Sequence, residues 1–375
     1  MARCTFLLRY GVGAFVTALA FLLILMAEAV LQPEFPAHIA SPLFLLAVTV
    51  SAWYGGKGPG LFTACLSYLT LDFVFLPPIF SLNPGWEDLP LAGLYVLAAI
   101  VIATLEGKRR RAEDVVHRSE ERMRLARNIQ ERLWAGAPPS LPEFDIAGRS
   151  YPAEAVGGDY FDIIPMRNGR LGLVVGDVSG HGVGSALLIS EVRAYLRALV
   201  LVYDDLSDIL TRANALLVND IAEGTFVTLF FACLDLHSRS MIFAGAGHEG
   251  ILLHATGSQE RLHSTSLPLG LEKDLVVTSA SAIELKSQEV VVMTSDGITE
   301  ALSRRGDRFG IDRTVEVIRG LRDRTAREMM DVLYQSVRAF TTGMPQSDDQ
   351  TALIVKVGTR KDAVGFLVGD RAAVL

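Results

Sequence analysis

The N-terminal part of the chain consists of apolar runs that are long enough to cross a bilayer. The first run, Gly11 to Leu31, is almost unbroken, and roughly 20 apolar residues suffice for one span. Three further runs follow at about Ile39 to Tyr54, Gly60 to Phe80 and Leu89 to Leu105. Because the first run is long for a signal peptide and others follow it, the pattern predicts an anchor of four transmembrane helices.

The charges between these runs predict their orientation. Basic residues precede the first run, lie between the second and third, and follow the fourth: Arg3, Arg9, Lys57 and Lys108 to Arg111. The other two loops carry only Glu34, Glu87 and Asp88 as charged residues. By the positive-inside rule both termini are cytoplasmic. We therefore expect a multi-pass protein of the inner (cytoplasmic) membrane, with its N-terminus and its C-terminal domain in the cytoplasm.

Two motifs in this region are similar to those of a known membrane domain. They are Tyr54-Gly55-Gly56-Lys57-Gly58-Pro59-Gly60-Leu61, and Phe73 to Leu82 with Leu76-Pro77-Pro78 inside it. This region, roughly residues 13 to 106, resembles the four-helix membrane domain of the KdpD-type sensor kinases. The alternative interpretation is that these glycines and prolines are only turns between spans.

Residues 106 to 135 are highly charged and lack proline, which predicts a continuous helix that extends the fourth span. Apolar or small residues recur there at spacings compatible with a heptad, and Gln130 interrupts them; they are Val116, Ser119, Met123, Ala126 and Leu133. Two interpretations stay open. The helix either forms a parallel coiled coil in a homodimer, or it is solvated and packs on its own domain.

From Phe144 to Val357 the pattern changes to short β-type runs with helical stretches between some of them. The predicted strands cover 144–151, 160–164, 171–175, 225–235, 240–246, 251–254, 289–294 and 351–357, and the predicted helices 184–203, 206–221, 311–319 and 325–340. Because strands and helices do not alternate regularly, an antiparallel α+β architecture is favoured over a doubly wound parallel sheet. The expected organisation is a transmembrane domain (1–106), a connecting signalling helix (107–140), an α+β domain (141–358) and a tail (359–375).

Composition agrees with a membrane part and excludes some functions. Hydrophobic residues make up 50% of the 375 residues, and the mean hydropathy of +0.33 is high for a soluble protein. The net charge of −7 argues against nucleic acid as the main partner. The three cysteines form no CxxC pair, so neither a disulfide framework nor a structural zinc site is expected.

Four turns of the C-terminal domain carry acids at one end of an apolar β-type run. They are Gly157-Gly158-Asp159-Tyr160, Val175-Gly176-Asp177-Val178-Ser179-Gly180-His181-Gly182, Thr294-Ser295-Asp296-Gly297 and Ser347-Asp348-Asp349-Gln350. An Asp before a Gly is by itself a common turn residue. Four such turns, with almost no histidine or cysteine nearby, suit a hard cation such as Mg²⁺ or Mn²⁺.

These turns belong to five motifs that resemble a known enzyme family. The motifs are Pro152 to Asp162, the turn around Asp177, Ala244 to His248, Ser295 to Glu300, and Asp348 to Thr351. Residues 141–357 resemble the SpoIIE/RsbU branch of the metal-dependent PPM (PP2C-like) Ser/Thr phosphatases. The resemblance implies a β-sandwich of two antiparallel sheets flanked by helices, with two Mn²⁺ or Mg²⁺ ions at one edge.

The resemblance also implies metal ligands and catalytic residues. The implied ligands are Asp159, Asp177, the peptide carbonyl of Val178, Asp296, Asp348 and Asp349. Asp177 would bridge the two ions, Asp159 would hold the second ion, and Asp296 would hold the first together with Asp348. Asp349 is either a ligand through water or a support for the others. Asp159, Asp177 and Asp296 are the predicted catalytic residues.

Other polar residues near these turns receive structural interpretations. We expect Asp162 to be structural or in the outer shell, and His181 to be a turn residue rather than a general acid. His248 would shape a turn, with Glu249 where related proteins usually carry proline.

The identity of the phosphate-binding residue stays open, because this chain departs from the eukaryotic members at the first motif. Gly158 precedes Asp159 where those members carry Glu, and the nearest upstream arginine is Arg149.

The predicted function is a membrane-anchored, metal-dependent phosphoprotein phosphatase. By resemblance alone, its substrate would be a phosphorylated Ser or Thr of a STAS-type anti-anti-sigma protein. The alternative is a non-catalytic membrane sensor or scaffold on the same fold. A histidine kinase is not supported, because His117 is followed by no Asn box and no glycine-rich ATP lid.

Overall fold

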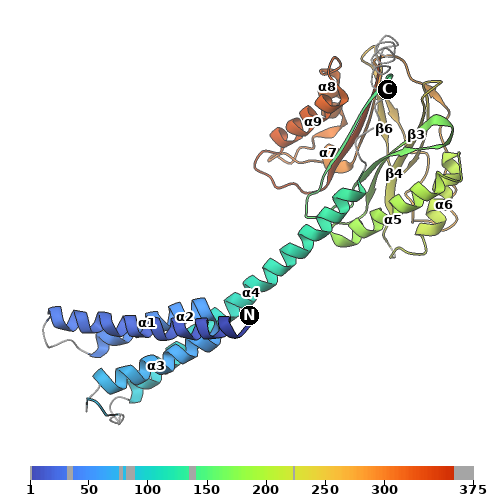
Figure 1. The fold of residues 1–375 in the computed structure, drawn as a ribbon. Helices are drawn as coiled ribbons and strands as arrows, with labels where there is room; N and C mark the ends of the chain where they lie inside the picture. Colours follow the sequence, from blue (N-terminus) through green and yellow to red (C-terminus); the bar gives the residue numbers. More distant parts are fainter. Residues whose placement is uncertain are drawn as a thin grey trace, which may run out of the picture. The chain divides into compact units, whose positions relative to one another are not determined.

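The structure is a computed structural model that describes residues 2–31, 37–75, 79–81, 89–134, 141–222 and 224–358. The chain divides into two compact units, Met1–Arg122 and Met123–Leu375 (Figure 1). Several sequence features lie outside the described residues: the loop acids Glu34, Glu87 and Asp88, the motif Leu76-Pro77-Pro78, and the tail 359–375.

The first unit contains three helices and most of a fourth. They are α1 (Ala2–Leu31), α2 (Ala37–Gly55), α3 (Lys57–Phe75) and α4 (Leu89–Leu133). Small residues let the first three approach closely, since a Cβ atom on Gly13 would collide with the hydroxyl groups of Thr63 and Ser51. Thr63 in turn donates a hydrogen bond of 2.8 Å to Ser51. This buried contact between α2 and α3 therefore depends on a glycine in α1.

Two of the described helices are long and apolar enough to cross a membrane. These segments are Leu8–Ala27 and Lys57–Phe75, and Ser41–Gly55 is apolar but shorter. The sequence predicts four spans, so the described residues support two of them by length and composition. The third helix begins earlier than the predicted run at Gly60, because Gly56 adopts a positive φ of 85° and α3 starts directly after it.

The second unit is built on two five-stranded antiparallel sheets. The first has the order β1 (Phe144–Tyr151), β10 (Gln350–Val357), β9 (Val290–Thr294), β6 (Gly250–Leu253) and β7 (Gln259–Leu262). The second has the order β2 (Tyr160–Pro165), β3 (Arg170–Val178), β4 (Val227–Asp235), β5 (Ser240–Ala246) and β8 (Ile283–Glu284). This confirms the predicted antiparallel α+β architecture.

Side-chain alternation explains how the sheets form three apolar layers. Leu173 and Val175 of β3 point into the core between the sheets, whereas Val174 points to the opposite face. That outer face is covered by α5 (Val183–Leu199) and α6 (Leu206–Leu217). The outer face of the first sheet is covered by α8 (Gly310–Arg319) and α9 (Ala326–Phe340). Figure 1 shows these helix pairs on opposite sides of the sandwich.

The elements that the sequence misses are short or polar. In β7 only Leu262 is buried, so this edge strand lacks an apolar alternation. The strand β8 has only two residues. The segment Asp296–Thr299, predicted as a turn, is the short helix α7.

One buried ion pair fixes α5 to the second sheet. Asp162 of β2 is fully buried, and both of its carboxylate oxygens accept hydrogen bonds of 2.7 Å from Arg197 of α5. The Tyr160 hydroxyl donates a third bond of 2.7 Å, and Arg193 lies 3.6 Å away. These contacts give Asp162 the structural role expected from the sequence.

Removing the main partner of this carboxylate should destabilise the second unit. In Arg197→Ala, Asp162 keeps only Arg193 as a cation and Tyr160 as a donor, and leaving a buried group without a hydrogen-bond partner costs about 1–3 kcal/mol. Urea unfolding of the two proteins measures the difference. The control Arg167→Ala removes an exposed arginine that lies 3.9 Å from Asp204 and should cost less than about 1 kcal/mol. Equal unfolding midpoints for Arg197→Ala and the control would contradict this assignment.

Candidate active site

Two of the predicted acids lie side by side at one end of the second sheet. Asp159 directly precedes β2, and Asp177 is the penultimate residue of β3. These strands are antiparallel neighbours in which Tyr160 pairs with Gly176. The start of one strand therefore lies beside the end of the other, which brings the two carboxylates into one neighbourhood.

The other acids lie at the corresponding end of the first sheet. Asp296 begins α7 immediately after β9, and Asp348 and Asp349 immediately precede β10. The two strands pair with Thr294 opposite Ala352. The four acid-bearing turns are thus delivered by two strand pairs, one from each sheet.

Ser295 connects these two strand pairs. Its side chain is buried and donates a hydrogen bond of 2.6 Å to Oδ2 of Asp159. It also accepts a bond of 3.0 Å from the backbone N–H of Thr351 in β10. Sequence reasoning did not assign this residue a role, although it directly precedes Asp296 in the Ser-Asp-Gly motif.

Asp349 positions the backbone before β2. Its Oδ1 accepts a bond of 2.7 Å from the N–H of Ala153, and its Oδ2 accepts bonds of 2.7 and 3.3 Å from Gly158 and Asp159. Gly157 has no room for a side chain, because a Cβ atom there would collide with the Asp349 carboxylate. Of the two roles left open for Asp349, these contacts favour a support for the site.

The shared negative charge changes how the carboxylates titrate. Burial, followed by the charges of Asp296 and Asp348, raises the pKa of Asp177 to about 7. Burial and then the Asp177 charge raise the pKa of Asp159 well above its usual range. Burial and the Asp348 charge also raise the pKa of Asp296.

The five acids have no basic partner among the described residues, since no Lys, Arg or His forms an ion pair with them. This excess of carboxylate charge fits a divalent cation. As the described side chains lie, however, no three His, Cys, Asp or Glu residues are grouped closely enough to hold a metal ion. Metal binding would therefore require the carboxylates to turn toward a common point.

His248 has the turn-shaping position expected from the sequence. It is buried, and its Nε2 lies 3.0 Å from the carbonyl oxygen of Thr294 while its Nδ1 lies 3.2 Å from the Thr228 hydroxyl. A carbonyl oxygen can only accept, so Nε2 carries the proton and Nδ1 accepts from Thr228. Burial lowers the pKa of His248 to about 4. The ring therefore stays neutral and links the strands β4 and β9.

His181 and Arg149 both face partners outside the carboxylate group. The exposed His181 ring lies 3.0 Å from Glu154. Arg149 of β1 pairs at 3.1 Å with Asp331 of α9. Arg149 is therefore engaged elsewhere and leaves the phosphate-binding role unfilled.

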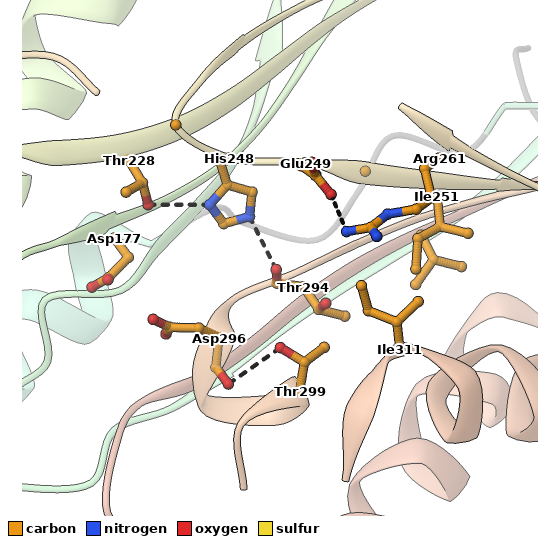
Figure 2. Close-up of a pocket in the computed structure, with 13 residues that line it drawn as sticks. Asp177, Thr228, His248, Glu249, Ile251, Arg261, Thr294, Asp296, Thr299 and Ile311 are labelled. Carbon is orange, nitrogen blue, oxygen red and sulfur yellow. Dashed lines mark hydrogen bonds and ion pairs between the residues drawn. The ribbon is translucent and has the colours of Figure 1, made fainter. Parts of the chain in front are cut away.

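A pocket of about 200 Å³ opens beside the carboxylates (Figure 2). Asp177 and Asp296 line one end, and Arg261 of β7 lies at the other. Arg261 donates a hydrogen bond to Glu249, which also pairs with His263 at 3.0 Å. The pocket is thus acidic at the site and carries a guanidinium farther out.

Gln130 of α4 contacts the same segment from the N-terminal side. Within the second unit, its buried side chain donates a bond of 2.7 Å to the Gly157 carbonyl and accepts one of 3.1 Å from the Gly157 N–H. The sequence suggested only that Gln130 interrupts a heptad seam. Gly157 lies two residues before Asp159 in the sequence, so Gln130 holds the segment that leads to this acid. The contact follows only from the fold, because 27 residues separate Gln130 from Gly157.

A comparison with protein families identifies the second unit. The family described as Stage II sporulation protein E (SpoIIE) matches residues 167–358, just over half of the chain. The chain belongs to the SpoIIE family. A second family, the Domain of unknown function (DUF4118), matches residues 10–119, the region that resembles the KdpD-type membrane domain.

Individual relatives agree with the SpoIIE assignment. Protein IcfG of Synechocystis is 27% identical over 65% of this chain, and phosphoserine phosphatase RsbU of Bacillus subtilis is 24% identical over 62%. The chain spans 42% of IcfG and 69% of RsbU. The solved structure of the SiaA-PP2C domain of Pseudomonas aeruginosa is similar to this chain with a TM-score of 0.56 and 19% sequence identity. The similarity covers 64% of this chain and 98% of that domain. The SpoIIE-type unit therefore has the PP2C fold.

The raised carboxylate pKa values predict that the metal-free protein is less stable at higher pH. Folded Asp177 binds its proton more tightly than the unfolded chain, in which the pKa is 3.8, so stability falls as the pH rises from 3.8 to about 7. In EDTA, the melting temperature should be lower at pH 8 than at pH 6. Mn²⁺ should raise it at pH 8 and reduce the pH dependence.

The variant Asp177→Asn serves as the control for this titration. It cannot ionise, so its melting temperature in EDTA should differ less between the two pH values. If the wild-type protein in EDTA is more stable at pH 8 than at pH 6, the crowded carboxylates do not raise the pKa of Asp177 as described.

Proposed function

We propose that the protein is a metal-dependent Ser/Thr phosphoprotein phosphatase. The observation that carries this proposal is the convergence of four acid-bearing turns at one end of a PP2C-type sandwich, without a basic partner among the described residues. Family membership and the phosphoserine phosphatase RsbU among the relatives support the same reaction.

Specific residues of this chain would hold two Mn²⁺ or Mg²⁺ ions. We assign Asp177 as the bridging carboxylate, Asp159 to the second ion, and Asp296 and Asp348 to the first. The Val178 carbonyl is a further candidate by resemblance, and it directly follows Asp177 and lies close to Gly158, the residue before Asp159. When bound, such ions bind phosphoryl oxygens and activate water for in-line attack. Asp349, Ser295 and Gln130 position the backbone around these ligands.

The proposed substrate is a phosphorylated Ser or Thr of a STAS-type regulatory protein. RsbU is a phosphoserine phosphatase, and the STAS class rests on resemblance. The pocket beside Asp177 and Asp296 would receive the residues that flank a phosphoserine, with Arg261 and its partner Glu249 at the far end. The alternative, a non-catalytic sensor on the same fold, predicts no phosphate release with any metal.

The proposed location is the inner membrane, with several spans and the phosphatase domain in the cytoplasm. Two candidate spans, the match to DUF4118 and the basic residues beside the apolar runs support this arrangement. The number of four spans and the orientation are part of this proposal.

We further propose that the membrane part controls activity through α4. This helix runs without interruption over Leu89–Leu133, and Gln130 near its end holds Gly157 by two hydrogen bonds. A shift of the last turns would therefore move the segment that carries Asp159. A homodimer through residues 106 to 135 would give the helix a partner against which to shift.

Replacing the bridging carboxylate should abolish turnover without unfolding the protein. Asp177→Asn keeps the side-chain shape but removes the charge that holds both ions, so phosphate release from a phosphoserine protein should fall about 100-fold or more. The control Asp204→Asn removes an exposed carboxylate and should have wild-type activity. Excess EDTA should inactivate the wild type, and Mn²⁺ or Mg²⁺ should restore it. Full activity in EDTA, or in Asp177→Asn, would refute the two-metal assignment.

Insertions into α4 test the control by the membrane part. Adding two to four residues near Arg118 rotates the following helix by a fraction of a turn, so activity at a fixed Mn²⁺ concentration should change. Adding seven should largely restore it, because the heptad repeats. The same residues added after Gly358, behind the last strand, are the control. Equal specific activity for every insertion length, together with a monomer in detergent, would leave the membrane part as an anchor only.

A further inference from the structure

A second large pocket lies wholly within the first unit, outside the phosphatase domain. Its volume is about 600 Å³. Three elements line it: Arg9 of α1, the junction Gly55-Gly56-Lys57 between α2 and α3, and seven residues of α4 that lie between Thr104 and Asp114 inclusive. The proposed phosphatase function uses none of these residues.

The pocket is strongly basic. Its basic residues are Arg9, Lys57, Lys108, Arg110 and Arg111, and its acidic residues are Glu113 and Asp114. Glu113 already accepts a hydrogen bond of 2.9 Å from Arg109, which is not part of the lining. None of the five lining cations forms an ion pair with a carboxylate that the structure describes, whereas Arg109 has two such partners.

Glycines give this pocket its walls. Gly107 of α4 faces Lys57, because a Cβ atom there would lie 3.3 Å from Cβ of Lys57. Gly55 faces Arg9 in the same way, because a Cβ atom on Gly55 would lie 3.6 Å from Cβ of Arg9. The backbones of three elements therefore come close together and direct their cations to one place. The helix α3 also begins at Lys57, so the positive end of its dipole lies at the pocket.

The pocket lies at the ends of the candidate membrane spans. One span begins at Leu8, next to Arg9, and the other begins at Lys57. In α4 the apolar run ends at Leu105, directly before the basic residues. In the proposed membrane arrangement this is the level at which lipid phosphates meet water, and basic pockets between helices on the cytoplasmic side bind anionic head groups.

We propose that this pocket binds a phosphate-bearing anion. The ligand chemistry is a phosphate group held by two or more of the five cations and by the start of α3. Two sources supply that chemistry: the head group of an anionic lipid, or a soluble phosphate compound. The proposal goes beyond the phosphatase function and stands on the first unit alone.

Two binding measurements on the full chain separate the sources. The protein in phosphatidylcholine nanodiscs, with EDTA present, is titrated with inorganic pyrophosphate by calorimetry. The EDTA keeps metal ions, and with them pyrophosphate, from the carboxylate site. In the second measurement, native mass spectrometry compares phosphatidylglycerol with phosphatidylcholine retained by the detergent-purified protein. Saturable pyrophosphate binding indicates a soluble ligand, and selective retention of phosphatidylglycerol indicates a head group.

Charge-matched variants assign the binding to the pocket. Lys57→Gln with Arg111→Gln should weaken the observed binding about tenfold or more, since each basic residue near an anionic head group contributes about 1 kcal/mol. Arg118→Gln with Arg122→Gln removes the same charge from the exposed part of α4 and should leave it unchanged. Lys57→Arg with Arg111→Lys should retain binding, which separates loss of charge from loss of folding.

The outcomes are decisive in either direction. If wild-type protein binds neither probe selectively, or if the Arg118 and Arg122 control weakens binding as much as the pocket variant, the pocket is not an anion site. Because both measurements need no phosphatase turnover, an inactive phosphatase domain would not affect this conclusion.

Discussion

Crowded negative charge is the constraint around which the second unit is arranged. Asp159, Asp177 and Asp296 are brought together by strand ends, and the first two are partly or fully buried. Their mutual repulsion and their burial raise each pKa, which means that the fold works against their ionised state. A site of this kind is stable as folded only if other contacts hold the turns in place.

The contacts that hold the turns come from side chains that carry no positive charge. Ser295 joins Asp159 to the start of β10, and Asp349 gathers three backbone N–H groups around the segment that precedes β2. Gln130 adds two further bonds to Gly157 from the opposite side. None of these groups adds an opposing positive charge, so they fix the backbone without neutralising the carboxylates.

The sequence predicts the strands and helices of this fold better than the long-range side-chain contacts that connect them. Apolar runs place most strands within two residues of their observed ends, because strands such as β4 and β10 are buried on both faces. The edge strand β7 escapes prediction because only Leu262 is buried. The acids were found because each follows or precedes a run. Gln130 and Ser295 were assigned no such role because their contacts join segments 27 and 136 residues apart, which no local pattern records.

The pairing of β1 with β10 has a consequence for the order of assembly. Phe144 pairs with Val357 and Tyr151 with Gln350, so the first strand of the sandwich hydrogen-bonds to the last. During synthesis β1 must wait for almost the whole domain before it gains its partner, and such long-range pairing is slow to form. Asp348 and Asp349 arrive with the same strand. A nascent chain therefore carries Asp159 and Asp177 long before the site can close around them, and the enzyme-like geometry appears only when the final strand is in place.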